Sequence, residues 1–528
     1  MSNIMILDCT LRDGGYINDN KFGEKNIKKL IQYLKSAKVD IIECGYLMDN
    51  IEYNKDKTEF LSCEQAESVI APNNEYALML LGEKYQIDNL PVRKSDQIDT
   101  IRMSFHKKSI SKIKDYAIKI NKKGYKLFLQ PTVIMAYTDE EIIEMIKMVN
   151  ELDVECISIV DTFGQMTPED TYQKTKIFDK YLRKEIKLGI HLHNNLQTAF
   201  ANAITFLDTI SEKRDVVIDA SLLGMGRGAG NLPTELIANY LNTRYKKNYN
   251  IESLLEASDS IISKIKKESD WGYSLPYYLS AINGIHPSYI ILFLERKTLN
   301  SIDINNLIKM IPEEKKLEFD REYAKELYRI YNDKKIDDNS SRTKLKKLIT
   351  GKKVILIGPG KSTIEYHDEI EAALGQDNVF SIDINGNDLY YTDASFYSNK
   401  KRYSDLCKKD NITLLTSNIK TNAEEDELVF DYNKSLSREY GISDNALLIM
   451  LNILKEIGVD DILLIGFDGF STNNHENFYS EEKMNALTEN FVKELNELMT
   501  NNIRAYSKKI KIKSLTPTKY LDRRKIWK

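Results

Sequence analysis

The first 245 residues alternate between short β-branched runs and amphipathic helical stretches, and this alternation limits the folds open to the chain. In residues 26–37, for example, the apolar side chains recur every three or four positions, as on one face of a helix. Eight strand–helix repeats predict an α/β fold of the closed (β/α)8 TIM-barrel type. The second and third crossovers are the least regular part, and an open doubly wound sheet is the structural alternative. The eight expected strands cover residues 4–8, 40–44, 76–81, 100–104, 126–131, 156–161, 187–193 and 216–221.

The rest of the 528 residues changes pattern twice. We expect the barrel to occupy residues 1–250 and a helical extension, suited to covering a barrel mouth, to occupy residues 251–331. Residues 332–350 begin with a charged segment poor in apolar residues, and we interpret them as a linker. Residues 351–528 again contain buried-type strands, which predict a Rossmann-like α/β domain. The strands and the helix expected there cover residues 354–357, 379–384, 412–417, 462–465 and 445–457.

Composition excludes several classes of protein. With 42% hydrophobic and 29% charged residues the chain is typical of a globular protein, and its net charge of −4 gives no sign of a nucleic-acid partner. Its five cysteines form no CxxC pair, which suits a reducing compartment. We find neither a signal peptide nor an apolar run of the roughly 18 residues that a membrane helix needs. These features predict a cytoplasmic protein without a membrane span.

Three motifs at expected strand ends carry chemically useful side chains. The segment DCTLRDGGY places Arg12 and Asp13 after the first strand, where a barrel presents its active-site face. His191 and His193 share one face of the seventh strand because alternate residues of a strand point the same way. The segment GMGRGAGN, which ends at Asn231, follows the eighth strand. Two imidazoles and a carboxylate form a good divalent-metal site with open positions.

Each motif alone is weak, since HxH pairs and glycine loops also occur without function, but the three in order are specific. Over residues 1–295 they resemble the metal-dependent TIM-barrel lyase and Claisen-condensing family, which includes 3-hydroxy-3-methylglutaryl-CoA lyase, and most of all its 4-hydroxy-2-oxovalerate aldolase branch. The resemblance implies a metal held by Asp13, His191 and His193, with Asn231 as a weaker fourth ligand. It also implies that Arg12 stabilises an enolate oxygen. Glu43 and Asp161 are then polar supports at the mouth or structural hydrogen-bond anchors.

One position departs from that family. The aldolases carry a histidine proton shuttle four residues after the motif arginine, whereas this chain has Tyr16. A tyrosine can relay a proton, but its ordinary pKa near 10 suits a base at neutral pH poorly. His286 and Tyr278, in the helical extension, are candidates if that segment covers the mouth. Because His286 precedes a proline, the interpretation as a turn residue is slightly favoured over a catalytic role.

The C-terminal segment carries a fainter resemblance. Gly358, Gly360 and Ser362 form a glycine turn after a strand, without the spacing of a Walker A loop. With Asn385 and Asp468, these residues resemble Rossmann-like domains of bacterial sialyltransferases and pterin-kinase-like proteins. The resemblance implies a nucleotide or nucleotide-sugar near the five residues. A tight strand-to-helix connection in a scaffold domain is the alternative.

The favoured function is a divalent-metal-dependent aldolase or lyase that acts on a 2-oxo acid and an aldehyde through a pyruvate-type enolate. The expected ligands suit Mn²⁺, Mg²⁺ or Zn²⁺. Alternatives are acyl-CoA-dependent Claisen condensation and a degenerate barrel in a binding or assembly protein. A Schiff-base aldolase would need a desolvated lysine, and Lys84 and Lys107 both lie in polar stretches. The sequence leaves homo-oligomerisation open.

Overall fold

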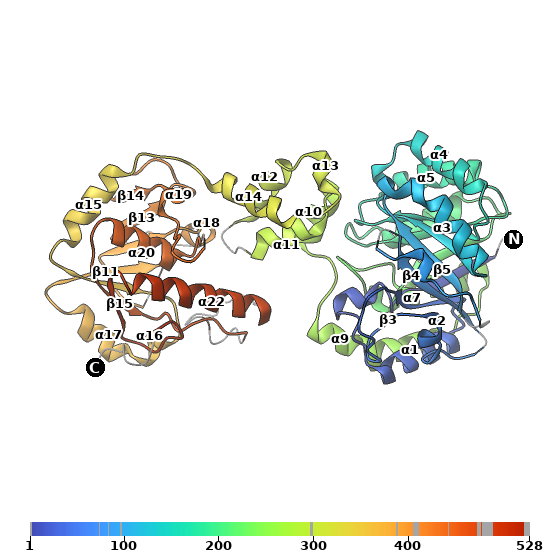
Figure 1. Cartoon of the computed structure of the whole chain (residues 1–528), viewed down its shortest axis with the longest axis horizontal. Helices are drawn as coiled ribbons and strands as arrows, with labels where there is room; N and C mark the ends of the chain where they lie inside the picture. Colours follow the sequence, from blue (N-terminus) through green and yellow to red (C-terminus); the bar gives the residue numbers. More distant parts are fainter. Residues whose placement is uncertain are drawn as a thin grey trace. The chain divides into compact units, whose positions relative to one another are not determined.

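The computed structural model describes residues 3–521, except 73, 83, 95–97, 296–298, 387–388, 405–410, 442, 473–476 and 478–488. The chain divides into two compact units (Figure 1). The barrel unit comprises residues 1–290 with 312–319, and the second unit comprises residues 291–311 with 320–528. No helix in the described ranges has the length and apolar character needed to cross a bilayer.

Eight parallel strands of the barrel unit close into a ring, which confirms the predicted TIM barrel. Each strand pairs with the next in space, and β1 completes the ring by pairing with both β2 and β9. The two-residue strand β3 (Glu59–Phe60) lies outside the ring and pairs with β2. The ring strands are β1 (Ile4–Asp8), β2 (Ile41–Leu47), β4 (Glu75–Leu81), β5 (Ile98–Phe105), β6 (Lys126–Pro131), β7 (Cys156–Asp161), β8 (Lys187–Leu192) and β9 (Val216–Ala220).

Helices cover most of the crossovers between these strands. Their starts follow from local sequence: Thr138 and Glu141 form a capping box at α4, and Thr167 and Asp170 form another at α5. The second and third crossovers, the irregular ones in the sequence, contain the five-residue α2 and the 3₁₀ turn Ile87–Asn89. The helices are α1 (Glu24–Ser36), α2 (Cys63–Glu67), α3 (Ile110–Lys122), α4 (Asp139–Asn150), α5 (Pro168–Tyr181), α6 (Ala199–Thr209) and α7 (Thr234–Tyr245).

The helical extension is helical as expected, but the two units share it. Residues up to Ile290 belong with the barrel, whereas residues 291–311 and the chain from Asp320 belong with the second unit. Trp271 fixes the first part, because its Nε1–H donates to Leu223 O on a barrel loop at 3.0 Å. The helices are α8 (Ile251–Ala257), α9 (Ser263–Glu268), α10 (Leu275–Asn283), α11 (Pro287–Glu295), α12 (Ser301–Lys309), α13 (Glu313–Lys316) and α14 (Arg321–Asn332).

The second unit is built on one parallel sheet with the order β14-β13-β12-β11-β10-β15-β16. The chain starts in β10, proceeds to one edge and returns to the other side of β10, as in doubly wound folds. This confirms the expected α/β class. Sequence reading missed the four-residue strands β12, β14 and β16. The elements are β10 (Lys353–Ile357), α16 (Ser362–Glu365), α17 (His367–Leu374), β11 (Val379–Ile384), β12 (Ala394–Tyr397), α18 (Lys400–Ser404), β13 (Ile412–Thr416), β14 (Glu427–Phe430), α19 (Tyr432–Ser435), α20 (Ala446–Glu456), β15 (Asp461–Ile465), α22 (Glu489–Tyr506) and β16 (Lys511–Ser514).

Part of the expected linker, residues 332–350, is a structural helix of the second unit. Helix α15 (Asn339–Ile349) buries Leu345 and Ile349 in the core of the sheet. Two of the charges that suggested a linker are inside the fold, because Arg342 Nε lies 2.7 Å from Asp338 Oδ2 and Arg342 Nη1 lies 2.6 Å from Glu456 Oε2. Buried ion pairs and solvated charges look alike in a sequence.

We predict that α15 supports the second unit. In a fragment spanning residues 291–528, Leu345→Ala should lower the free energy of unfolding by about 2–5 kcal/mol, because it opens a cavity in the core. The exposed Lys346 on the same helix is the control, and Lys346→Ala should change that free energy by no more than about 0.5 kcal/mol. Urea unfolding measures both. Equally small changes in the free energy of unfolding of both variants would show that α15 is a linker and not part of the core.

Candidate metal centre

Side chains from two strand ends, those of β1 and β8, meet at the carboxyl end of the barrel. A carboxylate oxygen of Asp13 and ring nitrogens of His191 and His193 all lie within 4.8 Å of one another. All three residues are buried, with 5% exposure or less. The backbone of the HxH segment pairs with the glycine loop, since Asn194 N donates to Gly230 O at 2.8 Å. The barrel therefore brings together the three predicted ligands.

Hydrogen bonds at Nδ1 orient both imidazoles. Nδ1–H of His191 donates to Asp219 Oδ2 at 2.9 Å, and Nδ1–H of His193 donates to Arg227 O at 3.1 Å. A carboxylate and a carbonyl only accept hydrogen bonds, so each Nδ1 carries the ring proton. Each Nε2 is then left with its lone pair, the form in which histidine binds a metal.

Asn231 completes the cluster with an oxygen that has no partner. Its amide Nδ2 donates to Asp13 Oδ2 at 2.6 Å, whereas its Oδ1 is buried and accepts no hydrogen bond from the described residues. The glycine loop packs directly on this pair: a Cβ at Gly226 would lie 2.3 Å from Asn231 Nδ2 and 2.7 Å from Asp13 Oδ2. A buried amide oxygen without a donor is the arrangement that a cation would satisfy.

Behind the cluster runs a buried chain of alternating charges. Arg12 Nη1 lies 2.6 Å from Asp13 Oδ1, and Arg12 Nε lies 2.7 Å from Glu43 Oε2. On the far side of Glu43, Arg102 Nη1 lies 2.9 Å from the same Oε2, and Arg102 Nη2 pairs with Asp219. Asp219 in turn accepts a hydrogen bond from His191. This row of ion pairs therefore connects two predicted ligands, Asp13 and His191.

The buried arginines keep the carboxylates of Asp13 and Asp219 ionised. Burial raises the pKa of Asp13, but Arg12 above all, with His193 and His191, outweighs burial and holds that pKa well below its ordinary value. Burial also raises the pKa of Asp219, and Arg102 above all reverses this, so the net shift is downward. Three carboxylates face two guanidiniums, which leaves one net negative charge beside the imidazoles. Such a charge attracts a cation.

Sequence reasoning missed Arg102 and Asp219. Both are charged residues inside otherwise apolar strand runs, TIRMSF and VVIDAS, and both are at most 1% exposed. Charged residues are almost never fully buried unless paired, so a charge within a buried strand was an available signal for an internal pair.

At the mouth, Tyr16 is half-exposed and lies between two ring contacts. Its ring meets that of Tyr46 edge-on with centroids 6.1 Å apart, and the guanidinium carbon of Arg227 lies 5.8 Å from its ring centroid. Arg227 Nη2 lies 2.5 Å from His286 Nε2. The segment that carries His286 therefore folds against the glycine loop, which is the condition under which His286 was a candidate.

The surroundings of His286 make it a poor base. Burial, followed by the charges of Arg227 and His106, lowers the pKa of His286 to about 3. Tyr278 is partly exposed, and its ring contacts that of Tyr273. Burial raises the pKa of the neighbouring Tyr277, and the positive charge of Arg227 partly offsets this rise.

The remaining barrel candidates have structural environments. Both carboxylate oxygens of Asp161 accept backbone N–H groups, from Gln165 at 2.9 Å and Met166 at 3.1 Å, and burial raises the pKa of Asp161 to about 7. This is the geometry of a turn anchor. Lys84 is exposed, and Lys107 pairs with Glu141. Neither lysine is desolvated as a Schiff-base nucleophile requires.

In the second unit, the glycine turn packs against the loop after β15. Gly360 N donates to Gly466 O at 2.9 Å, and a Cβ at Gly360 would lie 2.5 Å from that oxygen. Asp468 Oδ2 accepts the N–H of Ser362 at 2.9 Å. The structure thus joins Gly358, Gly360, Ser362 and Asp468, while Asn385 follows β11 with its Oδ1 lacking a donor among the described residues. Loop packing accounts for the glycines, and nucleotide binding stays a prediction.

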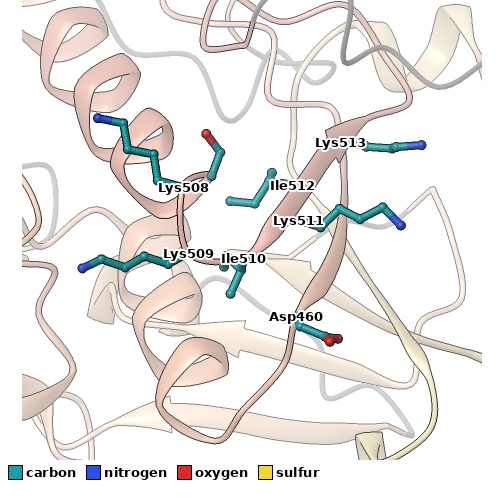
Figure 2. Close-up of a pocket in the computed structure, with 8 residues that line it drawn as sticks. Asp460, Lys508, Lys509, Ile510, Lys511, Ile512 and Lys513 are labelled. Atoms are coloured by element: carbon teal, nitrogen blue, oxygen red, sulfur yellow. The ribbon is translucent and has the colours of Figure 1, made fainter.

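A hollow of about 400 Å³ lies at the opposite edge of this sheet, where β15 and β16 begin. Four lysines between residues 508 and 513 line it, together with Asp460. Figure 2 shows the lysine side chains pointing outward in several directions rather than toward a common centre. Lys509 pairs with Glu439 and Lys511 with Asp461, so their charges are already compensated.

Comparison with known proteins agrees with the geometry of the barrel. Residues 92–261 match the HMGL-like family model. The chain is 27% identical over 270 residues to 4-hydroxy-2-oxovalerate aldolase of Chloroflexus aggregans, covering 49% of this chain and 76% of that protein. It is 23% identical over 249 residues to oxaloacetate decarboxylase of Mycobacterium tuberculosis, covering 46% and 70%. The HMG-CoA lyase structure from Bacillus subtilis aligns with a TM-score of 0.42 at 17% identity, over 50% of this chain and 93% of that one.

The matched segment runs from β5 to beyond the glycine loop, so it contains His191, His193 and Asn231. A closed parallel barrel, a buried His–His–Asp cluster at its carboxyl end and this match all agree. The barrel of this chain is thus similar, over residues 92–261, to the HMGL-like family.

Proposed function

We propose that the chain is a divalent-metal-dependent aldolase or lyase that forms or cleaves a carbon–carbon bond beside a 2-oxo acid, through a pyruvate-type enolate. The observation that carries this proposal is the convergence of Asp13, His191 and His193 next to the guanidinium of Arg12. The names of two relatives support it, because 4-hydroxy-2-oxovalerate and oxaloacetate are both 2-oxo acids.

The donor set fits a divalent metal. Asp13, His191, His193 and the unpartnered Oδ1 of Asn231 would hold it, and a mixed oxygen–nitrogen set without thiolate suits Mn²⁺, Mg²⁺ or Zn²⁺. When bound, such an ion would hold the carboxylate and keto oxygens of the acid and withdraw electrons from its keto group.

Arg12 is placed to stabilise the developing enolate oxygen. Its Nε and Nη1 are held by Glu43 and Asp13, which fixes the plane of the guanidinium. Its remaining nitrogen, Nη2, makes no hydrogen bond to the described residues and can donate to substrate. A donor that is oriented before the reaction stabilises charge at little reorganisation cost.

Tyr16 is the better supported proton relay. Its side chain is half-exposed at the mouth, beside the positive charge of Arg227. His286 has its Nε2 against Arg227 and a lowered pKa, so it remains neutral and weakly basic. The intact charge network also speaks against a degenerate barrel, since buried ionised groups without a role are costly to retain.

The first prediction from this proposal concerns the metal. His193→Ala should weaken Mn²⁺ binding by at least about 10-fold, because it removes a ligand while its hydrogen-bond partner is only a backbone carbonyl. Isothermal titration with MnCl₂ measures this. His367→Ala, which removes an imidazole from the second unit, is the control and should bind Mn²⁺ like the wild type. Unchanged binding by His193→Ala would sink the proposed site.

The second prediction separates two buried arginines. Arg12→Lys should lower turnover of a pyruvate aldol by about 10²–10³, as expected for loss of an oriented oxyanion donor, and should keep the melting temperature close to that of the wild type, because a positive charge still faces Asp13 and Glu43. Arg102→Ala should instead destabilise the barrel by about 3–5 kcal/mol, because it leaves Glu43 and Asp219 without a partner that they share. Turnover and thermal melts are measured on both variants. Parallel losses in both would make Arg12 a structural residue.

The third prediction concerns proton transfer. Tyr16→Phe should lower kcat by about 10²–10⁴, the range for loss of a positioned acid or base, and should leave Mn²⁺ affinity unchanged. The pH–rate profile of the variant should lose one limb. Tyr273→Phe is the matched control, since Tyr273 is exposed and contacts Tyr278. If both variants keep the wild-type profile, Tyr16 only shapes the pocket.

A further inference from the structure

Arg227 is a charged residue of the mouth that the proposed chemistry does not use. Arg12 and Arg102 each contact two carboxylates, whereas Arg227 forms no ion pair with any described residue. Its side chain is partly exposed and lies between the ring of Tyr16 and the ring of His286. A guanidinium in this setting offers several unused N–H donors.

The position of Arg227 is fixed by its backbone. Its carbonyl oxygen accepts from His193 Nδ1, which ties the residue to a predicted metal ligand. The next residue, Gly228, has a positive φ of 73°, and a Cβ there would lie 2.9 Å from Asn195 Oδ1. The loop is therefore closely packed, and the side chain of Arg227 leaves it at a defined point beside the site.

His286 holds the guanidinium of Arg227 in place. Because arginine only donates hydrogen bonds, Nη2–H of Arg227 donates to the lone pair of His286 Nε2. The other N–H groups of Arg227 make no hydrogen bond to the described residues. They are available to an oxyanion placed at the mouth.

We propose that Arg227, assisted by His286, binds a carboxylate at the end of the substrate remote from the 2-oxo group. This inference rests on the proposed function, in which the 2-oxo end is held at Asp13, His191 and His193. The substrate is then a 2-oxo dicarboxylate, and the aldehyde partner carries a carboxylate of its own. One guanidinium matches the single charge of a carboxylate, whereas a doubly charged phosphate calls for more donors.

Isothermal titration of the Mn²⁺-loaded full chain with two unreactive acids of equal length tests the inference. 2-Oxoglutarate carries the remote carboxylate, and 2-oxovalerate has a methyl group in its place. The wild type should bind 2-oxoglutarate more tightly. Arg227→Gln should weaken the affinity for 2-oxoglutarate by about 10–100-fold, because it removes a hydrogen bond to a charged group. The affinity for 2-oxovalerate should stay within about twofold of the wild type. Arg244→Gln, on the exposed last turn of α7, is the control.

The outcomes separate this inference from the proposed function. Equal weakening of both acids, no preference in the wild type, or no binding of 2-oxoglutarate would overturn the role of Arg227. Removal of Mn²⁺ with EDTA tests the other end: if affinity for both acids is unchanged, the metal proposal fails. A 2-oxoglutarate affinity that still depends on Arg227 would in that case uphold the carboxylate site alone.

Discussion

The architecture of the barrel depends on one electrostatic problem, which is how to hold several ionised groups inside a dry core. No member of the charged chain could be buried alone, because desolvating an isolated ion costs far more than a domain can offset. Each member neutralises its neighbour, and the six come from five strands or the loops that follow them. The ion pairs of the site can therefore form only when the strands of the ring have come together. The contributing residues are Asp13, Arg12, Glu43, Arg102, Asp219 and His191.

What the sequence could predict follows from periodicity. The two-residue repeat of strands places His191 and His193 on one face, and barrel geometry sends strand ends to a common mouth. A charge inside an apolar strand signals that Arg102 is paired, but the sequence could not tell which strands supply its partners, Glu43 and Asp219. It also could not separate the buried pairs of α15 from solvated charges, since the difference lies in Glu456, far along the chain.

The second unit illustrates how one motif can have two physical causes. Glycines after a first strand suit a phosphate, and they equally suit the close approach of another loop. Here Gly466 approaches from β15, and the carboxylate of Asp468 accepts the Ser362 N–H at the start of α16. A negative side chain already occupies the place where a phosphate would accept that hydrogen bond. Any nucleotide at this edge must either displace Asp468 or bind beside it.

The residue at position 227 performs two tasks with different parts of itself. Its carbonyl oxygen orients His193, and every amino acid has such an oxygen; its side chain reaches the mouth, and only arginine has that one. Mutation of residue 227 therefore changes the side chain at the mouth and keeps the carbonyl oxygen that orients His193. Because the backbone and the side chain have separate roles, substitutions at this position can change substrate specificity while His193 keeps its orientation.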